Sequence, residues 1–319
     1  MQKILVLRGG ALGDFLVTLP ALVLLRQRWP DARIELAGNA TAAALAQRNG
    51  PPLVGAPLRE TTAARRQAPA LHSDLLDIVH LQHEARWSAL FAVTPLPADF
   101  AAWLAEFDLV VNFWPDNDDA LRAKFPLHAQ QTFLQGAAHP TRAPAAAHYC
   151  EALRPLGLAA PTTENFVFQL RPHDSNARLI AIHPGSGSPR KNWPLDRWTA
   201  LVEWLARDHR ADLLIVTGET ESEAARALAR FGTPADNLSL PELATQLARC
   251  RLFLGHDSGV SHLAAACGAP SVLLFGPTEP AMWAPPAANV RVLKREADVA
   301  SLSLAEVQRA VAAALSDRK

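Results

Sequence analysis

Short apolar runs alternate with helix-like segments through the second half of the chain, and most of these runs end in turns of small or polar residues. Strands are expected at 179–183, 213–217, 252–255, 271–275 and 290–293, and helices at 195–209, 221–231, 243–249 and 260–267. Unbroken apolar runs are typical of strands buried on both faces of a parallel sheet. Because repeated strand–helix units join parallel strands through right-handed crossovers, this half is predicted to be an open α/β sheet.

The first half opens with the same kind of unit. Residues 3–7 form an apolar run, three glycines follow in a tight turn, and a helix is expected from Asp14 to about Arg28. Further strands are expected at 33–36 and 108–113, and helices near 99–106 and 148–156. Residues 51–97 show no clear period and are rich in Pro, Arg and His, so loops with short helices are expected there.

The length of 319 residues predicts two domains, since a domain usually has roughly 150 residues. We expect an N-terminal domain at 1–170 and a C-terminal domain at 171–302, both Rossmann-like, with their parallel sheets facing a central cleft. A final amphipathic helix at 303–316 could pack on either half, including back on the N-terminal domain. The predicted fold class is therefore α/β with two Rossmann-like domains.

Charge and apolar content limit the partners. Lys and Arg number 31, as do Asp and Glu, so the formal net charge is zero, whereas a duplex nucleic-acid binder normally has a basic surplus. The longest apolar stretch, 15–25, is shorter than the roughly 20 residues that a membrane-spanning helix needs. Cys150, Cys250 and Cys267 lie far apart without CxxC spacing, which favours buried free thiols in a reducing cytoplasm.

The first candidate site lies in the turn after the first strand, where the sequence from 8 to 14 is Arg-Gly-Gly-Ala-Leu-Gly-Asp. Glycines let a ligand approach the backbone closely and leave helix N–H groups free for an anion or a polar substrate. The spacing is not GxGxxG, and the second strand ends without the carboxylate that a ribose needs, so a nicotinamide cofactor is disfavoured. Asp14 is interpreted either as a helix N-cap or as a general base.

The second candidate site is the loop His-Pro-Gly-Ser-Gly-Ser at 183–188 and the segment Pro-Arg-Lys-Asn-Trp-Pro that follows at 189–194. The backbone around Gly187, the hydroxyls of Ser186 and Ser188 and the ammonium of Lys191 are the groups that a diphosphate requires. The alternative is a flexible surface loop with solvated charges.

The third candidate site is Gly-His-Asp-Ser-Gly-Val-Ser-His at 255–262, where another strand runs into a helix. Ser258 and Gly259 stand where helix N–H groups meet an anion. Asp257 is expected either to fix this loop or to orient the Lys191 ammonium. The histidines at 256 and 262 match no standard metal spacing, so we expect one of them to be structural and count His262 with the donor-binding residues.

Weaker candidates lie elsewhere. One of the glutamates between 219 and 223, with Glu221 as the nearest candidate, is interpreted as a ribose ligand or as an acidic residue favoured in a first helical turn. Asp-Asn-Asp at 116–118 imitates a metal-binding DxD motif in an acidic turn, and no metal is expected there. Arg65 and Arg66 either contact an anionic acceptor or form a solvated pair.

Taken together, these motifs resemble glycosyltransferase family 9, the heptosyltransferases of lipopolysaccharide inner-core assembly. The matching segments are 8–14 with Thr-Leu-Pro-Ala-Leu at 18–22, 183–185 with Lys-Asn-Trp-Pro at 191–194, 255–266, Gly-Ala-Pro at 268–270 and Phe-Gly-Pro-Thr at 275–278. The resemblance covers most of the second half and both ends of the first. It fades between about 50 and 105, where the acceptor would bind.

The resemblance implies a GT-B fold, with the acceptor site in the N-terminal half and the nucleotide-sugar in the C-terminal half. It implies an inverting, metal-independent transfer of a heptose, or a related sugar, from an ADP-sugar to a lipopolysaccharide core-type acceptor. Asp14 would be the base, and Lys191 would neutralise charge on the departing diphosphate. Phosphate contacts would come from Ser186, Gly187, Ser188, Ser258, Gly259 and His262 with support from Asp257, and acceptor contacts from Gly13, Arg65 and Arg66.

No cofactor is expected apart from the nucleotide-sugar, and no nucleic-acid partner. The chain is expected to be a cytoplasmic monomer with at most peripheral association, at the inner face of the inner membrane. The alternatives are another nucleotide-sugar enzyme, such as an epimerase, and a non-catalytic protein that binds a sugar nucleotide. An epimerase would act on the sugar nucleotide without an acceptor, whereas a binding protein would show neither transfer nor hydrolysis.

Overall fold

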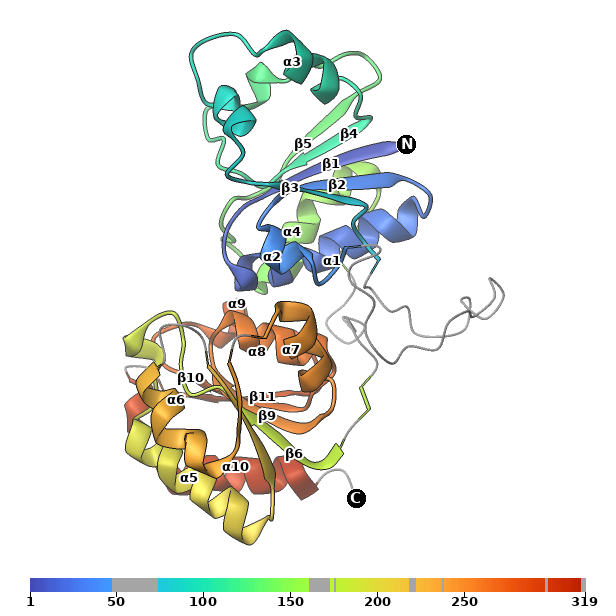
Figure 1. Ribbon diagram of the computed structural model, residues 1–319. Helices are drawn as coiled ribbons and strands as arrows, with labels where there is room; N and C mark the ends of the chain where they lie inside the picture. Colours follow the sequence, from blue (N-terminus) through green and yellow to red (C-terminus); the bar gives the residue numbers. More distant parts are fainter. Residues whose placement is uncertain are drawn as a thin grey trace, which may run out of the picture. The chain divides into compact units, whose positions relative to one another are not determined.

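The computed structural model describes residues 1–47, 74–160, 173–174, 176–217, 222–236, 238–295 and 298–316. Their contacts divide the chain into two compact units, and each is described by itself (Figure 1). The described residues up to 160 belong to the first unit, and those from 173 onward belong to the second. The predicted domain boundary at 170 and 171 lies outside the described residues.

The first unit is built on a five-stranded parallel sheet with the order β3-β2-β1-β4-β5. Its strands are β1 (Lys3–Arg8), β2 (Arg33–Gly38), β3 (Ile78–Leu81), β4 (Leu109–Asn112) and β5 (Thr132–Gln135). The first strand lies in the middle, and Leu5 pairs with Glu35 on one side and with Val110 on the other. The strand order reverses between β1 and β4. Open α/β sheets bind ligands at the carboxyl ends of the strands on either side of such a reversal.

Helices cover both faces of this sheet. On one face α1 (Leu12–Arg28) packs against α2 (Ala40–Ala43) and α4 (Ala145–Cys150), and α4 continues as a 3₁₀ helix over Glu151–Leu156. Figure 1 shows α3 (Ala98–Leu104) on the other face. There, α3 and the 3₁₀ helix over Ala85–Leu90 enclose an aromatic core that includes Trp87, Phe100, Phe107, Trp114, Phe125 and Phe133.

The second unit is a six-stranded parallel sheet with the order β11-β10-β9-β6-β7-β8. Its strands are β6 (Asn176–Ile182), β7 (Asp212–Val216), β8 (Thr233–Ala235), β9 (Cys250–His256), β10 (Ser271–Phe275) and β11 (Val290–Lys294). Strands β6 and β9 are neighbours, with Ile182 paired to Leu254. The order reverses here, so the loops after β6 and β9 meet at the expected ligand position.

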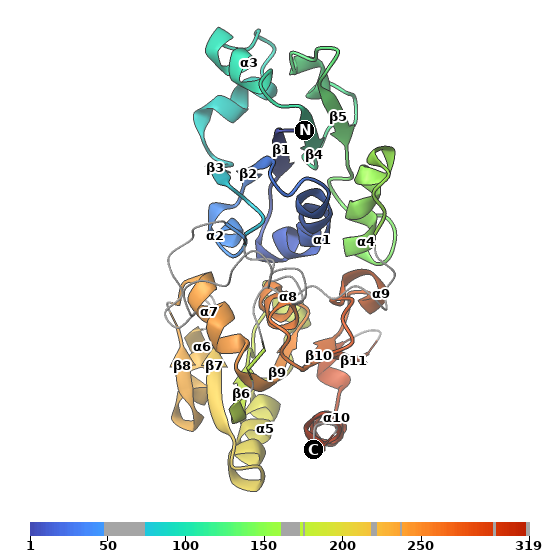
Figure 2. The same cartoon turned by 90° about the vertical axis from the view of Figure 1, so that its right-hand side faces the viewer.

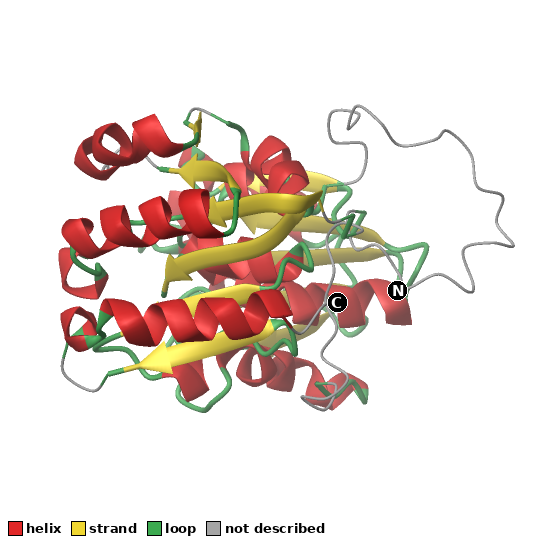
Figure 3. Cartoon of the chain, turned by 90° about the horizontal axis from the view of Figure 1, so that it is seen from below, coloured by secondary structure: helices red, strands yellow, loops and turns green. Residues whose placement is uncertain are grey.

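Helices also cover both faces of the second sheet (Figures 2 and 3). On one face lie α5 (Leu195–Asp208), α6 (Ser222–Leu228) and α10 (Leu304–Ser316), and on the other lie α7 (Leu240–Leu247) and α8 (Gly259–Ala266). A short helix α9 (Pro280–Trp283) follows β10. Figure 2 shows α5 beside α10, and Val307, Val311 and Leu315 of α10 pack into the core of this unit. The last helix thus belongs to the second unit.

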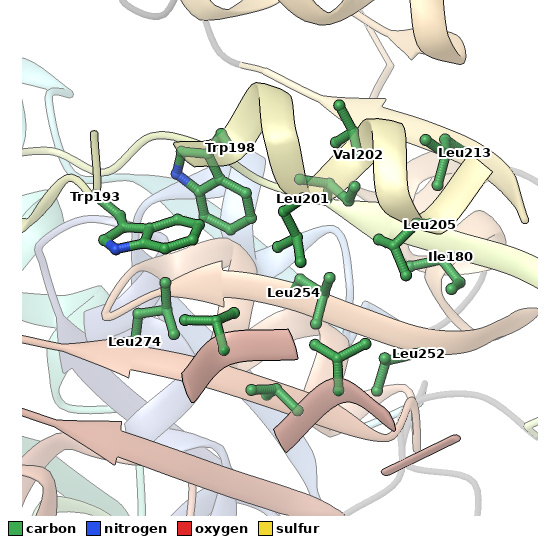
Figure 4. Close-up of a cluster of buried hydrophobic side chains, with 14 of the residues drawn as sticks. Ile180, Trp193, Trp198, Leu201, Val202, Leu205, Leu213, Leu252, Leu254 and Leu274 are labelled. Atoms are coloured by element: carbon green, nitrogen blue, oxygen red, sulfur yellow. The ribbon is translucent and has the colours of Figure 1, made fainter. Parts of the chain in front are cut away.

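The core under α5 is shown in Figure 4. Leu201 and Leu205 of α5 face Leu252 and Leu254 of β9, and each such buried leucine contributes roughly 1.5–3 kcal/mol. The indole rings of Trp193 and Trp198 meet edge to face at 5.3 Å, and the Trp193 indole N–H donates to the Leu302 carbonyl at 2.8 Å. This core therefore fixes the segment that carries Lys191 to the sheet and to the C-terminal part of the unit.

The predicted fold class is confirmed, because both units are parallel α/β sheets with Rossmann-like strand orders. Three strands, β3, β5 and β8, were not predicted, and β3 corrects part of the loop expectation for 51–97. Each has three or four residues and lies at a sheet edge, so it lacks the long apolar run of a central strand.

Two further expectations concern the whole chain. None of the helices in the described ranges is long and apolar enough to cross a membrane. All three cysteines are buried and free of disulfides, as predicted. Burial raises the pKa of the Cys150 thiol and that of the Cys250 thiol to about 12, so neither is a reactive thiolate.

Candidate functional site

In the first unit the candidate site is the turn between β1 and α1. Gly10 has a φ of 104°, and a side chain there would place its Cβ 2.5 Å from the Asp14 Oδ2 atom. Glycine is therefore required at this position both by the backbone and by the neighbouring carboxylate. The Asn39 amide, just after β2, donates to the Gly10 carbonyl at 3.1 Å and holds the turn to the sheet.

Asp14 is the third residue of α1, and the N-cap position belongs to Ala11. The Asp14 Oδ2 atom accepts a hydrogen bond from the Ala11 backbone N–H at 2.9 Å, and its Oδ1 atom lies 3.2 Å from the Arg8 guanidinium. Asp14 thus satisfies a free N–H at the helix start without being the N-cap residue itself. Its side chain remains 39% exposed, so solvent can reach Asp14.

The buried guanidinium of Arg8 holds this carboxylate. Its other donors reach Thr18 Oγ1 at 3.0 Å, the Ala138 carbonyl at 3.1 Å and the Tyr149 hydroxyl at 3.0 Å. Burial is the main cause that raises the pKa of Tyr149, and the nearby Asp14 charge adds to it while Arg8 opposes it. No local sequence pattern marks Tyr149, whereas the position of Arg8 at the end of a buried strand marks it as a candidate.

In the second unit the candidate site is formed by the loops after β6 and β9. Lys191 ends the 3₁₀ helix over Pro189–Lys191, and its ammonium lies 2.7 Å from the Asp257 Oδ2 atom. The Lys191 side chain is 28% exposed and that of Asp257 is 11% exposed. Of the two roles expected for Asp257, the structure therefore supports orientation of the Lys191 ammonium.

Ser258 is the N-cap of α8, and its hydroxyl accepts from the Ser261 backbone N–H at 3.3 Å. The two serine hydroxyls lie 3.1 Å apart. Helix α8 begins directly after this cap, at Gly259. The positive end of its dipole therefore follows closely after Asp257, the partner of Lys191. The arrangement combines one ammonium with the start of a helix, and both attract anions.

His256 is fully buried and ties the two loops together. Its Nε2 atom accepts from the Trp193 backbone N–H at 2.8 Å, which assigns the ring proton to Nδ1, 3.3 Å from the Gly185 carbonyl. Burial lowers the pKa of His256 to about 3, so the ring is neutral. His256 thus has a structural role, which was expected for one of the two histidines at 256 and 262. His262 is also buried, within α8.

The serine loop after β6 is organised by its own side chains. The Ser186 hydroxyl lies 2.8 Å from the Ser188 carbonyl and 2.7 Å from the Asn192 side-chain oxygen, and it accepts from the Ser188 N–H at 3.3 Å. Ser186 therefore shapes the loop. A Cβ on Gly187 would meet no atom within 4 Å, so this part of the loop borders open space.

The remaining candidates are those predicted to contact the ribose or the acceptor. Glu221, Arg65 and Arg66 lie outside the described residues, and Gly13 is the second residue of α1.

The two carboxylate oxygens of Asp116 accept the backbone N–H groups of Leu121 at 2.8 Å and Arg122 at 2.9 Å. The Asp-Asn-Asp segment at 116–118 is thus a backbone-capping turn. Within the described ranges, no group of three or more His, Cys, Asp or Glu side chains is arranged to hold a metal ion.

Known structures share the fold. The crystal structure of a family 9 glycosyl transferase from Veillonella parvula matches with a TM-score of 0.73 at 20% identity, covering 99% of this chain and 98% of that one. Escherichia coli heptosyltransferase WaaC with ADP matches with a TM-score of 0.67 at 18% identity, covering 98% and 100%. Both likenesses concern the fold of the chain.

Sequence comparison is more specific. Lipopolysaccharide heptosyltransferase 1 of E. coli K12 is 28% identical over 137 residues, and the match spans 40% of this chain and 42% of that protein. The chain thus matches about two fifths of the length of this curated relative. The sequence model of glycosyltransferase family 9 (heptosyltransferase) matches residues 140–308. This match is more than half of the chain and includes both loops of the candidate site in the second unit. The chain belongs to glycosyltransferase family 9.

Proposed function

We propose that the chain is a glycosyltransferase that transfers a heptose, or a related sugar, from an ADP-sugar to a lipopolysaccharide core-type acceptor. Family membership supports the reaction class, and the names of its relatives, a lipopolysaccharide heptosyltransferase and a heptosyltransferase with ADP, support the donor and acceptor. The observation that carries the proposal is the Lys191–Asp257 pair, 2.7 Å apart, next to the start of α8 at the reversal point of the second sheet.

Asp14 is the proposed general base. Its partly exposed carboxylate accepts the proton of the attacking acceptor hydroxyl, whose oxygen forms a bond to the anomeric carbon of the donor sugar. The bond from that carbon to the β-phosphate oxygen breaks, and ADP departs with the electron pair. Attack on the face opposite the departing ADP inverts the configuration of the anomeric carbon.

Lys191 is proposed to neutralise the charge that grows on the departing diphosphate. Asp257 holds the ammonium in place, and backbone N–H groups at the start of α8 and around Gly187 supply further donors. A cation in this position performs the task that a metal ion serves in other enzymes, so we propose a metal-independent reaction. The expected monomeric state, cytoplasmic location and peripheral membrane contact stay predictions.

The test is a transfer assay with purified protein, ADP-heptose and a heptose-deficient lipopolysaccharide, followed by product mass and ADP release. ADP release that depends on the acceptor and persists in EDTA is expected. Absence of product, ADP release without an acceptor, or loss of activity in EDTA contradicts the proposal.

A thermal-shift panel of ADP, GDP, UDP and NAD tests the donor separately. A ligand at 100 times its Kd adds about 2.7 kcal/mol to the free energy of unfolding, so the preferred nucleotide is readily distinguished. We expect the largest shift with ADP, and a larger shift with UDP contradicts the assignment of the donor.

A further inference from the structure

Three strands of the first unit bring polar atoms together at the carboxyl edge of its sheet. Gly9 follows β1, Gln82 follows β3 and Trp114 lies just after β4. A Cβ on Gly9 would lie 3.1 Å from the Gln82 Oε1 atom and 3.4 Å from the Trp114 Nε1 atom. An amide and an indole N–H therefore converge on a position that has no side chain of its own.

The Trp114 indole is held rigidly. Its ring packs edge to face on Trp87 with centroids 5.5 Å apart. Its backbone N–H donates to the Asn112 Oδ1 atom at 2.9 Å, and the fully buried Asn112 amide is in turn bonded to the Gln135 side chain at 2.8 Å. The tryptophan is thus fixed by its neighbours and needs little reordering to bind a ligand.

The Trp114 indole N–H has no acceptor within the part of the chain that the structure describes, although the residue is only 8% exposed. Buried tryptophans usually place this N–H on a hydrogen-bond partner. Unlike the enclosed indole nitrogen of Trp198, the Trp114 nitrogen is reached by solvent. A preorganised donor of this kind is suited to an oxygen atom of a bound molecule.

An exposed aromatic ring lies beside these groups. Phe91 is 61% exposed, and its ring centroid lies 6.1 Å from that of Trp114 at an interplanar angle of 34°. A sugar ring presents both hydroxyl groups and an apolar face of C–H groups. An accessible aromatic face beside an indole N–H and a side-chain amide matches both surfaces.

We propose that Phe91, Gln82 and Trp114 form a saccharide subsite that binds a sugar residue of the acceptor. The inference rests on the proposed function, because it takes the acceptor to be an oligosaccharide. Because Gly9 has no side chain, nothing at that position blocks the approach of a sugar oxygen to the amide and the indole. The neighbouring Gly10 packs on Asp14, so the subsite and the proposed base belong to the same edge of the first unit.

The test measures binding directly, without turnover. The core oligosaccharide released from a heptose-deficient lipopolysaccharide is titrated into the full chain by calorimetry. Trp114→Phe removes the indole N–H and keeps an aromatic ring. The matched control is Trp29→Phe at the C-terminal end of α1, where Trp29 contacts Arg28. We expect Trp114→Phe to raise the Kd about 3- to 10-fold, as loss of one hydrogen bond does, and Trp29→Phe to leave it within twofold.

Gly9→Ala is a second variant, because its methyl group would occupy the space between the amide and the indole. In the transfer assay, both subsite variants should raise the KM for the acceptor, with the kcat and the KM for ADP-heptose nearly unchanged. Equal behaviour of Trp114→Phe and Trp29→Phe, or no binding of the oligosaccharide by the wild-type protein, overturns the subsite. Binding that depends on Trp114 without any transfer supports the subsite and contradicts the proposed function.

Discussion

The candidate site of each unit contains an ion pair at the carboxyl edge of a parallel sheet, and the two pairs are opposite in exposure. In the first unit the Arg8 side chain is 5% exposed and that of Asp14 is 39% exposed. In the second unit the Lys191 side chain is 28% exposed and that of Asp257 is 11% exposed. The first unit therefore exposes the anion of its pair, and the second exposes the cation.

The difference assigns a supporting role to each buried partner. Arg8 is kept in place by hydrogen bonds to Thr18, Ala138 and Tyr149, so its charge is compensated even though it is buried. Asp257 fixes one ammonium that remains accessible. A base and a charge-neutralising cation are the two groups that the proposed transfer needs, and each is the exposed member of its pair.

The largest expected effect comes from removing the exposed anion. Asp14→Asn keeps the shape of the side chain and eliminates its basicity, so kcat should fall about 10²- to 10⁴-fold. Single-turnover kinetics with ADP-heptose and acceptor measure the change. Asp31→Asn, a substitution at an exposed residue in the turn between α1 and β2, is the control and should keep wild-type rates. Turnover by Asp14→Asn at the rate of this control would remove Asp14 from the mechanism.

Removing the exposed cation should have the next largest effect. Lys191→Met retains a long side chain but not the charge, and we expect kcat to fall about 10²- to 10³-fold because the departing diphosphate loses electrostatic stabilisation. Steady-state ADP release reports the rate. The adjacent exposed Arg190 provides the control, and Arg190→Met should differ from wild type by less than threefold. Equal losses in both variants would indicate a general effect of positive charge instead of a specific role for Lys191.

The two units should also differ in their response to acid. His256 is neutral in the folded second unit, because burial lowers its pKa to about 3, whereas the unfolded chain binds a proton as pH falls through about 6.5. The free energy of unfolding should therefore decrease by at most about 1.4 kcal/mol per pH unit between pH 6 and pH 3.

In the first unit the buried carboxylate of Glu35 behaves differently. Burial is the largest single influence and raises the pKa of Glu35. The His80 hydrogen bond and the Arg33 charge lower this pKa and together outweigh burial, so the net shift is downward. The stabilisation from Glu35 is present above pH 4.5 and is lost as pH falls below it. Hydrogen exchange between pH 6.5 and 4.5 should thus show increased opening in the second unit first. His256→Gln should remove that trend, and an unchanged trend in this variant would contradict the assignment.

The smallest expected effect comes from removing a hydrogen bond that holds Arg8 of the Arg8–Asp14 pair. Tyr149→Phe removes a hydroxyl that is bonded to Arg8 at 3.0 Å and should cost about 0.5–1.5 kcal/mol of stability, with a few-fold loss of kcat. Urea unfolding measures the loss of stability.

Tyr149 is the single tyrosine of the chain, so the change in tyrosine absorbance with pH reports the ionisation of this residue. Titration clearly above pH 10 is expected, since burial raises its pKa. Titration at or below pH 10 would contradict the buried site.

The sequence predicted the candidate site of the second unit more completely than that of the first unit. Long buried strands such as β9 give unbroken apolar runs, and the polar residues directly after them, such as Asp257, are easily placed at the ligand edge. Lys191 and Ser258 belong to the same kind of loop. Their arrangement depends mostly on neighbours within a few residues and on two adjacent strands.

The supporting residues of the first unit depend on contacts that are distant in sequence. Tyr149 reaches Arg8 across 141 positions through the packing of α4 on α1, and no local pattern signals this contact. Gln82 was not predicted because β3 has only four residues at a sheet edge, without a clear apolar run. Propensity and periodicity identify elements, whereas such contacts arise from how the elements pack.

The central claim is that the first unit supplies the base and the second unit holds the nucleotide. Calorimetric titration of ADP into Asp14→Asn and Lys191→Met tests it most directly. We expect Asp14→Asn to bind ADP with a Kd within twofold of wild type and Lys191→Met to bind about 10-fold more weakly, since it loses a charge-assisted contact. Equal loss of ADP binding in both variants, or wild-type binding by Lys191→Met, would contradict this division between the units.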